Sequence, residues 1–206
     1  MDKIHFCSSL NIRYPEKEIF FRLGGNVFKT DLSPEEKLSY GMVARSAFSL
    51  CRPQGVWRLV KRSEFAASGI LLENGSLLAG KKFSDLVRGR NALLLGAVTV
   101  GTQVIAARDS LERISDRAVY DAVASETADA AMDMLFSLAS SELLRSGAVA
   151  DTGRYSPGYG DMSLDNQKLF FQLLDMRKIG INLTEHCYMI PEKSVTAVSG
   201  VTLQNY

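Results

Sequence analysis

The chain has 206 residues, of which 24 are Lys or Arg, 23 are Asp or Glu and 46% are hydrophobic, so its formal net charge is +1. This length suits a single sizeable domain, and the balanced charge creates no long-range field that would attract nucleic acid or an anionic membrane. Because the sequence contains neither a long apolar run nor a signal peptide at its N-terminus, we expect a cytoplasmic protein with no nucleic-acid or membrane partner.

Residues 1–30 are expected to form an extension in front of a larger domain at residues 31–206. Residues 1–14 alternate between apolar and polar side chains, as a β-strand does. Residues 16–23 have the pattern of a short amphipathic helix, which a pair of glycines ends. The extension is therefore predicted to contain an arm or an edge strand and one helix.

A strong helix start follows at Ser33-Pro34-Glu35-Glu36. Ser33 is a good N-cap, Pro34 suits the first helical position, and Glu36 lies three residues after the cap, where it completes a capping box. The helix is predicted to run to about Cys51.

The segment at residues 53–80 favours β-strands. Asn74-Gly75 separates two short apolar stretches within it, which is typical of a hairpin. Residues 83–88 indicate one or two helical turns, and the apolar run at residues 92–100 predicts a central strand.

The end of that strand, Thr99-Val100-Gly101, invites comparison with dinucleotide-binding loops. The glycine pattern G-x-G-x-x-G that such loops use is absent. An oxidoreductase that uses this strand end is one functional hypothesis, and it would require binding of a nicotinamide cofactor.

Two helices are predicted next, at residues 103–114 and 115–144. The apolar face of the longer one carries small and branched side chains, and its alanines predict close packing against other elements. The members of this face are Val123, Thr127, Ala130, Ala131, Met134 and Leu138. Glu126 and Asp129 lie on its flank, three residues apart and therefore adjacent on the helix surface. Acids in this position ordinarily face water.

The stretch Arg154-Tyr155-Ser156-Pro157-Gly158-Tyr159-Gly160-Asp161 has the form of a loop that grips a ligand. Arg154 offers a planar fork of donors that suits a carboxylate or a phosphate. Pro157-Gly158 predicts a tight turn, because proline fixes the first central φ and glycine accepts a positive φ at the second. Tyr155 and Tyr159 flank the turn with flat faces that could border a ligand. The alternative is a connecting loop whose arginine pairs with a surface carboxylate.

After this loop, Ser163 is expected to cap a helix that runs to Arg177, and Gly180 ends it. From Leu183 onward the pattern favours strands. Helices that alternate with hairpin-like strands, without regular βαβ units, indicate an α+β fold with a mainly antiparallel sheet.

Few arrangements for autonomous catalysis are present. The two histidines, His5 and His186, supply hardly any base for a catalytic triad, and neither has metal-ligand spacing. His186 and Cys187 are expected to diverge as neighbours on a strand. The three cysteines are far apart and indicate free thiols rather than a disulfide framework or a metal site.

The loop and the segments after it resemble the activation domain of cobalamin-dependent methionine synthase. The matching residues are Arg154-x-x-Pro157-Gly158-Tyr159, Leu183-Thr184-Glu185 and Pro191-x-x-Ser194-Val195, and the resemblance is strongest over residues 150–201. Thr99 and Gly101 match a comparable strand end, and Ala128-Asp129-Ala130 matches an Ala-Glu-Ala triplet. The resemblance implies a twisted antiparallel sheet with helices packed around it.

The resemblance also implies that S-adenosylmethionine is the ligand. Arg154 would bind its carboxylate, Pro157 and Gly158 would let the loop backbone approach the adenosine, and Tyr159 would line the opening through which the methyl group meets the corrin ring. Asp129, shorter than the family's Glu by one methylene, would accept a bond from the ligand, with Glu126 as a possible substitute.

The implied function is reductive methylation that converts inactive cob(II)alamin into methylcobalamin. The D-x-H-x-x-G signature of proteins that ligate cobalt through a histidine is missing. We therefore expect the cobalamin to reside on a separate methionine synthase or another corrinoid methyltransferase, with flavodoxin or ferredoxin as a possible electron donor. The alternative is a binding or assembly partner of a corrinoid protein that keeps the fold without methyl donation.

Overall fold

A computed structural model describes residues 3–25 and 33–204 of the chain. Their central feature is an antiparallel sheet in the order β4-β3-β2-β5-β9-β6, with β1 pairing to the first half of β2. The strands are β1 (Ile4–Cys7), β2 (Gln54–Ala66), β3 (Gly69–Leu72), β4 (Leu77–Ala79), β5 (Ala92–Thr99), β6 (Ala148–Ala150) and β9 (Ser194–Leu203). A small separate hairpin consists of β7 (Asn182–Leu183) and β8 (Met189–Ile190). The fold is α+β, as predicted.

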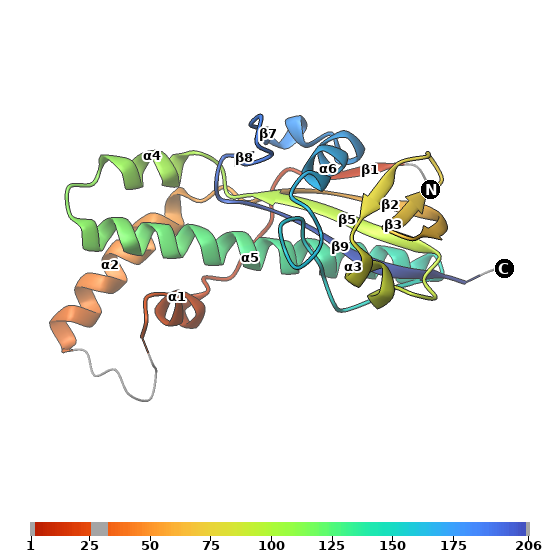
Figure 1. The fold of residues 1–206 in the computed structure, drawn as a ribbon. Coiled ribbons are helices and arrows are strands. Elements are labelled where there is room, and N and C mark those ends of the chain that lie inside the picture. Colours follow the sequence, from red (N-terminus) through yellow and green to blue (C-terminus); the bar gives the residue numbers. More distant parts are fainter. Residues whose placement is uncertain (1–2, 26–32, 205–206) are drawn as a thin grey trace.

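The helices lie around this sheet (Figure 1). They are α1 (Glu16–Arg22), α2 (Pro34–Leu50), α3 (Lys81–Leu86), α4 (Gln103–Ser110), α5 (Ile114–Arg145) and α6 (Asn166–Leu174), and a 3-10 turn, η1, follows at Met176–Ile179. One half of α5 runs along the sheet, and its other half extends beyond the sheet to pack with α1, α2 and α4. None of the helices in the described ranges combines the length and apolar character needed to cross a membrane.

Strand β5 lies at the centre of the sheet, and every one of its residues is buried. On one face, its Leu93 and Leu95 pack in a cluster with Phe83 of α3 and Phe170 of α6. Residues of β5 that point to the opposite face, such as Leu94, pack in a second cluster with α5. The sheet is therefore covered on both faces.

Helix α5 approaches the sheet closely because two strand positions are glycines. A Cβ at Gly96 would lie 2.5 Å from Cε2 of Phe136, and one at Gly55 would lie 2.9 Å from Leu135. Such distances are too short for a real contact, so larger residues would push α5 away.

Several predicted elements are confirmed. Helix α2 begins with the complete capping box, in which Ser33 Oγ accepts from the Glu36 N–H at 3.2 Å and Glu36 accepts from the Ser33 N–H at 2.8 Å. The hairpin around Asn74-Gly75 is β3–β4, and the apolar run is the central strand β5. The N-terminal edge strand is β1, although it is shorter than the alternation indicated. Residues 1–2 and 26–30 of the predicted extension lie outside the described residues.

Other expectations were wrong. Leu138 is 47% exposed, because the buried stripe of α5 continues through Leu135 and Ala139 instead. Helix α6 begins at Asn166 rather than Ser163, and Asp175 in the left-handed conformation separates it from η1. His186 and Cys187 lie in the turn between β7 and β8 rather than on a strand.

Candidate functional site

The loop that carries Arg154 is fastened to the sheet by its own backbone. Tyr155 N–H donates to the Val198 carbonyl, and Val198 N–H donates to the Tyr155 carbonyl, each at 2.8 Å. The Tyr155 ring also packs against Phe83 of α3, with ring centroids 5.7 Å apart. These contacts hold Arg154 beside β9, although the two residues before it are exposed.

The predicted tight turn is present at Ser156–Tyr159. Tyr159 N–H donates to the Ser156 carbonyl at 3.2 Å, which closes a four-residue turn. Gly158, its third residue, has φ +93°, which an L side chain rarely adopts. Pro157 is buried, whereas 71% of Tyr159 is exposed. The turn therefore places the Tyr159 ring at the surface.

The far end of the loop is also held. The Asp161 carboxylate accepts from the backbone N–H of Lys82 at 2.9 Å, and this contact ties the loop to α3. Gly158 N–H donates to the Met162 carbonyl at 2.8 Å. Both ends of the loop are thus fixed, and the turn between them has a defined position.

A cleft of about 520 Å³ lies between this loop, α5, α6 and the start of β9. We call it the Arg154 cleft, and its lining residues are Asp129, Met132, Arg154, Tyr155, Ser156, Pro157, Tyr159, Gln167, Met189, Ser194, Val195, Thr196 and Ala197. This volume is in the range of about 300–1,000 Å³ that is usual for small-molecule sites. The cleft thus brings the predicted Arg154, Pro157, Tyr159 and Asp129 together, and Gly158 lies within its turn.

Arg154 is partly buried at the edge of the cleft, with 29% of its side chain exposed. Its Nη2 atom lies 2.5 Å from Oδ1 of Asp133 on α5. The guanidinium carbon lies 5.5 Å from the centre of the Phe136 ring, a distance suited to a cation–π contact. The arginine fork is therefore oriented before any ligand binds.

The two acids that were candidates for ligand binding differ in position. Asp129 lines the Arg154 cleft, whereas Glu126 lines only the neighbouring hollow between α5 and residues 13–18. Arg22 of α1 pairs with both, through Nε to Glu126 and through Nη2 to Asp129 at 3.4 Å. Of these two acids, Asp129 is thus the one that lines the Arg154 cleft.

The charge on Asp129 is less favourable than on an ordinary aspartate. Partial burial raises its pKa above the usual value of 3.8, the Glu126 carboxylate raises the pKa further, and Arg22 opposes the shift. A donor or cation from a ligand would relieve this accumulation of negative charge.

Two buried polar side chains form the inner wall of the cleft. Gln167 of α6 donates to the Thr196 hydroxyl of β9 at 2.8 Å, and both residues are almost fully buried. Sequence reasoning missed both, because a glutamine in a helix and a threonine in a strand carry no local signal of a site. The packing of α6 onto β9 brings them together.

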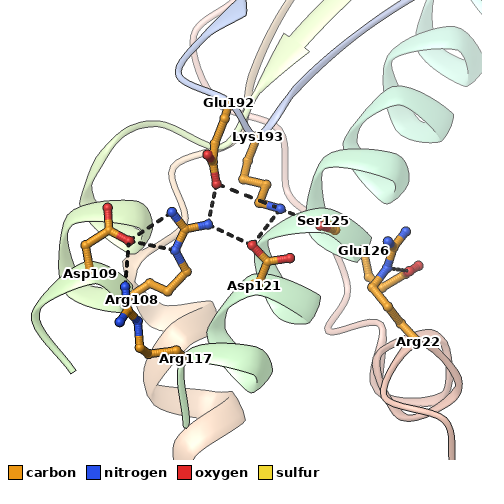
Figure 2. A network of polar contacts seen from close by, with 9 residues as sticks. All are labelled: Arg22, Arg108, Asp109, Arg117, Asp121, Ser125, Glu126, Glu192 and Lys193. Atoms are coloured by element: carbon orange, nitrogen blue, oxygen red, sulfur yellow. Dashed lines mark hydrogen bonds and ion pairs between the residues drawn. The ribbon is translucent and has the colours of Figure 1, made fainter. Parts of the chain in front are cut away.

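A network of charges fixes the chain segment before β9 (Figure 2). Arg108 of α4 pairs with three carboxylates: Asp109 at 2.9 Å, Asp121 of α5 at 2.7 Å, and Glu192. Lys193 donates to Ser125 at 3.0 Å and lies 2.8 Å from Asp121. Because Ser194 to Ala197 line the cleft, the network anchors that wall to α5.

The protonation of this network is well defined. Burial alone would lower the pKa of Arg108, but its hydrogen bonds to carboxylates raise the pKa above the ordinary value. Burial would likewise raise the pKa of Asp121, but Lys193 and Arg108 lower it below 3.8. Both groups therefore stay charged at neutral pH.

Thr99 and Gly101 serve a local purpose at the end of β5. The Gly101 N–H donates to Thr99 Oγ1 at 3.2 Å, and Gly101 has φ +81°. Neither residue lines the Arg154 cleft. Within the described ranges, no group of three or more His, Cys, Asp or Glu side chains is placed to hold a metal ion.

A family model for the activation domain of vitamin B12-dependent methionine synthase matches residues 96–205, which is more than half of the chain. The chain belongs to this activation-domain family. The match includes the end of the central strand, α5, the loop and β9, and so contains every residue named above for the Arg154 cleft. No protein with a curated functional description matches the chain significantly.

The fold agrees with a solved structure, the MetH reactivation domain bound to AdoHcy. The two are 16% identical with a TM-score of 0.66, and the match covers 99% of this chain and 80% of that one. The shared fold therefore extends to the N-terminal residues that precede the family match.

Proposed function

We propose that this chain binds S-adenosylmethionine in the Arg154 cleft and presents its methyl group for reductive methylation of cob(II)alamin held by a separate corrinoid methyltransferase. The observation that carries the proposal is the placement of Arg154, Asp129 and the Gly158 turn around one cleft of suitable size. The relative that binds AdoHcy shares this fold, which supports a ligand of the same type.

The residues of the cleft fit the parts of the ligand. Arg154 would bind the methionine carboxylate with a charge-assisted bond worth roughly 1.5–3 kcal/mol. Asp129 would accept a hydrogen bond from the ligand, such as one from a ribose hydroxyl. The positive φ of Gly158 lets the loop backbone lie against the adenosine without a side chain between them.

The exposed position of Tyr159 fits a role at the opening of the cleft. Its ring would direct the methyl group of the sulfonium outward, toward a corrin ring on the partner. One electron from a donor such as flavodoxin or ferredoxin and the methyl cation from the sulfonium would together give methylcobalamin, and adenosylhomocysteine would leave. The protein thus supplies orientation, and the two cofactors supply the reactive groups.

The test is a reactivation assay in which the chain is supplied separately. Methionine synthase that lacks its own activation domain is prepared with cob(II)alamin and mixed with the chain, S-adenosylmethionine and a reductant. We expect the absorbance spectrum of methylcobalamin to appear with one adenosylhomocysteine for each cobalamin. Tyr159→Ala should slow this step more than it weakens binding. If the chain binds the cobalamin protein but forms no methylcobalamin, the alternative of a non-catalytic partner is favoured.

A further inference from the structure

The Arg154–Asp133 ion pair lies at the boundary of two hollows on the surface of α5. Arg154 lines the cleft, and Asp133 lines the neighbouring hollow between α5 and residues 13–18. Asp129 lies one helical turn before Asp133 and lines both. A positive and a negative group thus lie side by side at one end of the proposed ligand site, with 2.5 Å between Nη2 and Oδ1.

We propose that Asp133 and Arg154 together recognise the zwitterionic α-amino acid head of the ligand. This inference rests on the proposed function and extends it to a residue that the sequence pattern did not single out. The carboxylate and the ammonium of an α-amino acid are attached to the same carbon, so a protein that binds both needs two opposite charges close together. Arg154 receives the carboxylate, and Asp133 receives the ammonium.

The distribution of cations on α5 favours Asp133 over the other acids for this role. Arg22 already pairs with Glu126 and Asp129, whereas the ion pair of Asp133 is with Arg154. When the ligand carboxylate occupies the fork of Arg154, the charge of Asp133 loses part of its compensation. The ligand ammonium restores it, and the exchange leaves no charge unpaired.

Exposure and geometry agree with such an exchange of partners. The Asp133 side chain is 70% exposed, so its carboxylate can rotate toward a bound ligand without disturbing the core. The Phe136 ring under the Arg154 guanidinium keeps the arginine in place while Asp133 moves. Asp129 is then left to bond a different part of the ligand.

The test compares two ligands that differ in the amino acid head. S-adenosylmethionine has the head, and 5′-methylthioadenosine lacks it. Both are titrated by calorimetry into the parent chain, Asp133→Asn and Asp133→Glu. Asp116→Asn is the matched control, because it makes the same change on the same helix, where Asp116 lies 3.9 Å from Arg113. A merely structural role of Asp133 would affect both ligands alike.

We expect Asp133→Asn to weaken binding of S-adenosylmethionine about tenfold, or about 1.4 kcal/mol, and to leave 5′-methylthioadenosine within about twofold. Asp133→Glu should recover part of the loss, and Asp116→Asn should behave as the parent. Unchanged or tighter binding of S-adenosylmethionine to Asp133→Asn would overturn the inference, as would an equal loss for both ligands. A parent chain that binds neither compound would overturn the proposed function itself, together with this inference.

Discussion

Tyr155 and Val198 are joined by two backbone hydrogen bonds, one in each direction, so the first half of the loop at residues 154–161 continues the hydrogen bonding of β9. The second half is a turn that depends on glycine. The hydrogen bonds to β9 thus hold the loop in place, and the glycine turn shapes its contact surface. Each feature can be tested by substitution.

The turn at Gly158 gives the first prediction. Gly158→Ala should lower the free energy of unfolding by about 1 kcal/mol and weaken ligand binding, because alanine is strained at φ +93°. Gly153→Ala is the control in the same loop, since Gly153 has no positive φ and nothing within 4 Å of an added Cβ. Urea denaturation measures both effects. Equal stability of the two variants would contradict the role of the turn.

The second prediction concerns the contact between Gly160 and Tyr155. A Cβ at position 160 would collide with the Tyr155 hydroxyl, while the ring carbon behind it would remain at an ordinary distance of 3.4 Å. Gly160→Ala should therefore lower the melting temperature, and adding Tyr155→Phe should restore part of it. The remaining loss reflects φ +60° at Gly160. A double variant no more stable than Gly160→Ala alone would show that the collision is not the cause.

The third prediction addresses the charge network. Arg108→Gln should lower the free energy of unfolding by more than about 1 kcal/mol, because three carboxylates lose a largely buried partner. It should also weaken ligand binding, since Glu192 and Lys193 precede the cleft wall. Arg88→Gln is the control, as Arg88 forms an exposed pair with Asp85 at 2.7 Å and such pairs contribute about 0–1 kcal/mol. Similar losses in the two variants would argue against the network.

The fourth prediction is a dependence on alkaline pH. Burial raises the pKa of the Cys51 thiol from 9.0 to about 11. Between these values the unfolded chain releases a proton that the folded chain keeps, so the free energy of unfolding falls as pH rises, by up to about 1.4 kcal/mol per pH unit. Denaturant titrations from pH 8 to about 11 should show this decline, and Cys51→Ala should show less of it. A parallel decline in both proteins would assign the effect elsewhere.

Much of the fold could be predicted because local signals agreed with it. The capping box at Ser33, the Asn74-Gly75 hairpin and the apolar run of β5 each specify their element within a few residues. The strand β6 was missed, because Ala148–Ala150 is too short to show a pattern and forms through its pairing with β9. The end of α6 at Asp175 also lacks a local cause in the sequence, since aspartate seldom adopts φ +49°.

The candidate site, like the fold, has some features that local sequence signals predict and others that depend on tertiary packing. The turn at Pro157-Gly158 was predictable from two residues, and the structure has it. Gln167 and Asp133 could not be found, because their positions in the cleft region depend on how α6 and α5 pack against distant segments. The sequence left Glu126 open as a substitute for Asp129, and the lining of the cleft, which includes Asp129 and not Glu126, now distinguishes them.

The most direct test of the central claim is calorimetric titration of S-adenosylmethionine into the purified chain and into Arg154→Ala, with Arg88→Ala as a control for loss of an arginine outside the cleft. The account predicts binding in the micromolar range, a loss of about tenfold or more, at least about 1.4 kcal/mol, in Arg154→Ala, and no change in Arg88→Ala. Binding that Arg154→Ala leaves unchanged, or no binding by the parent chain, would contradict it.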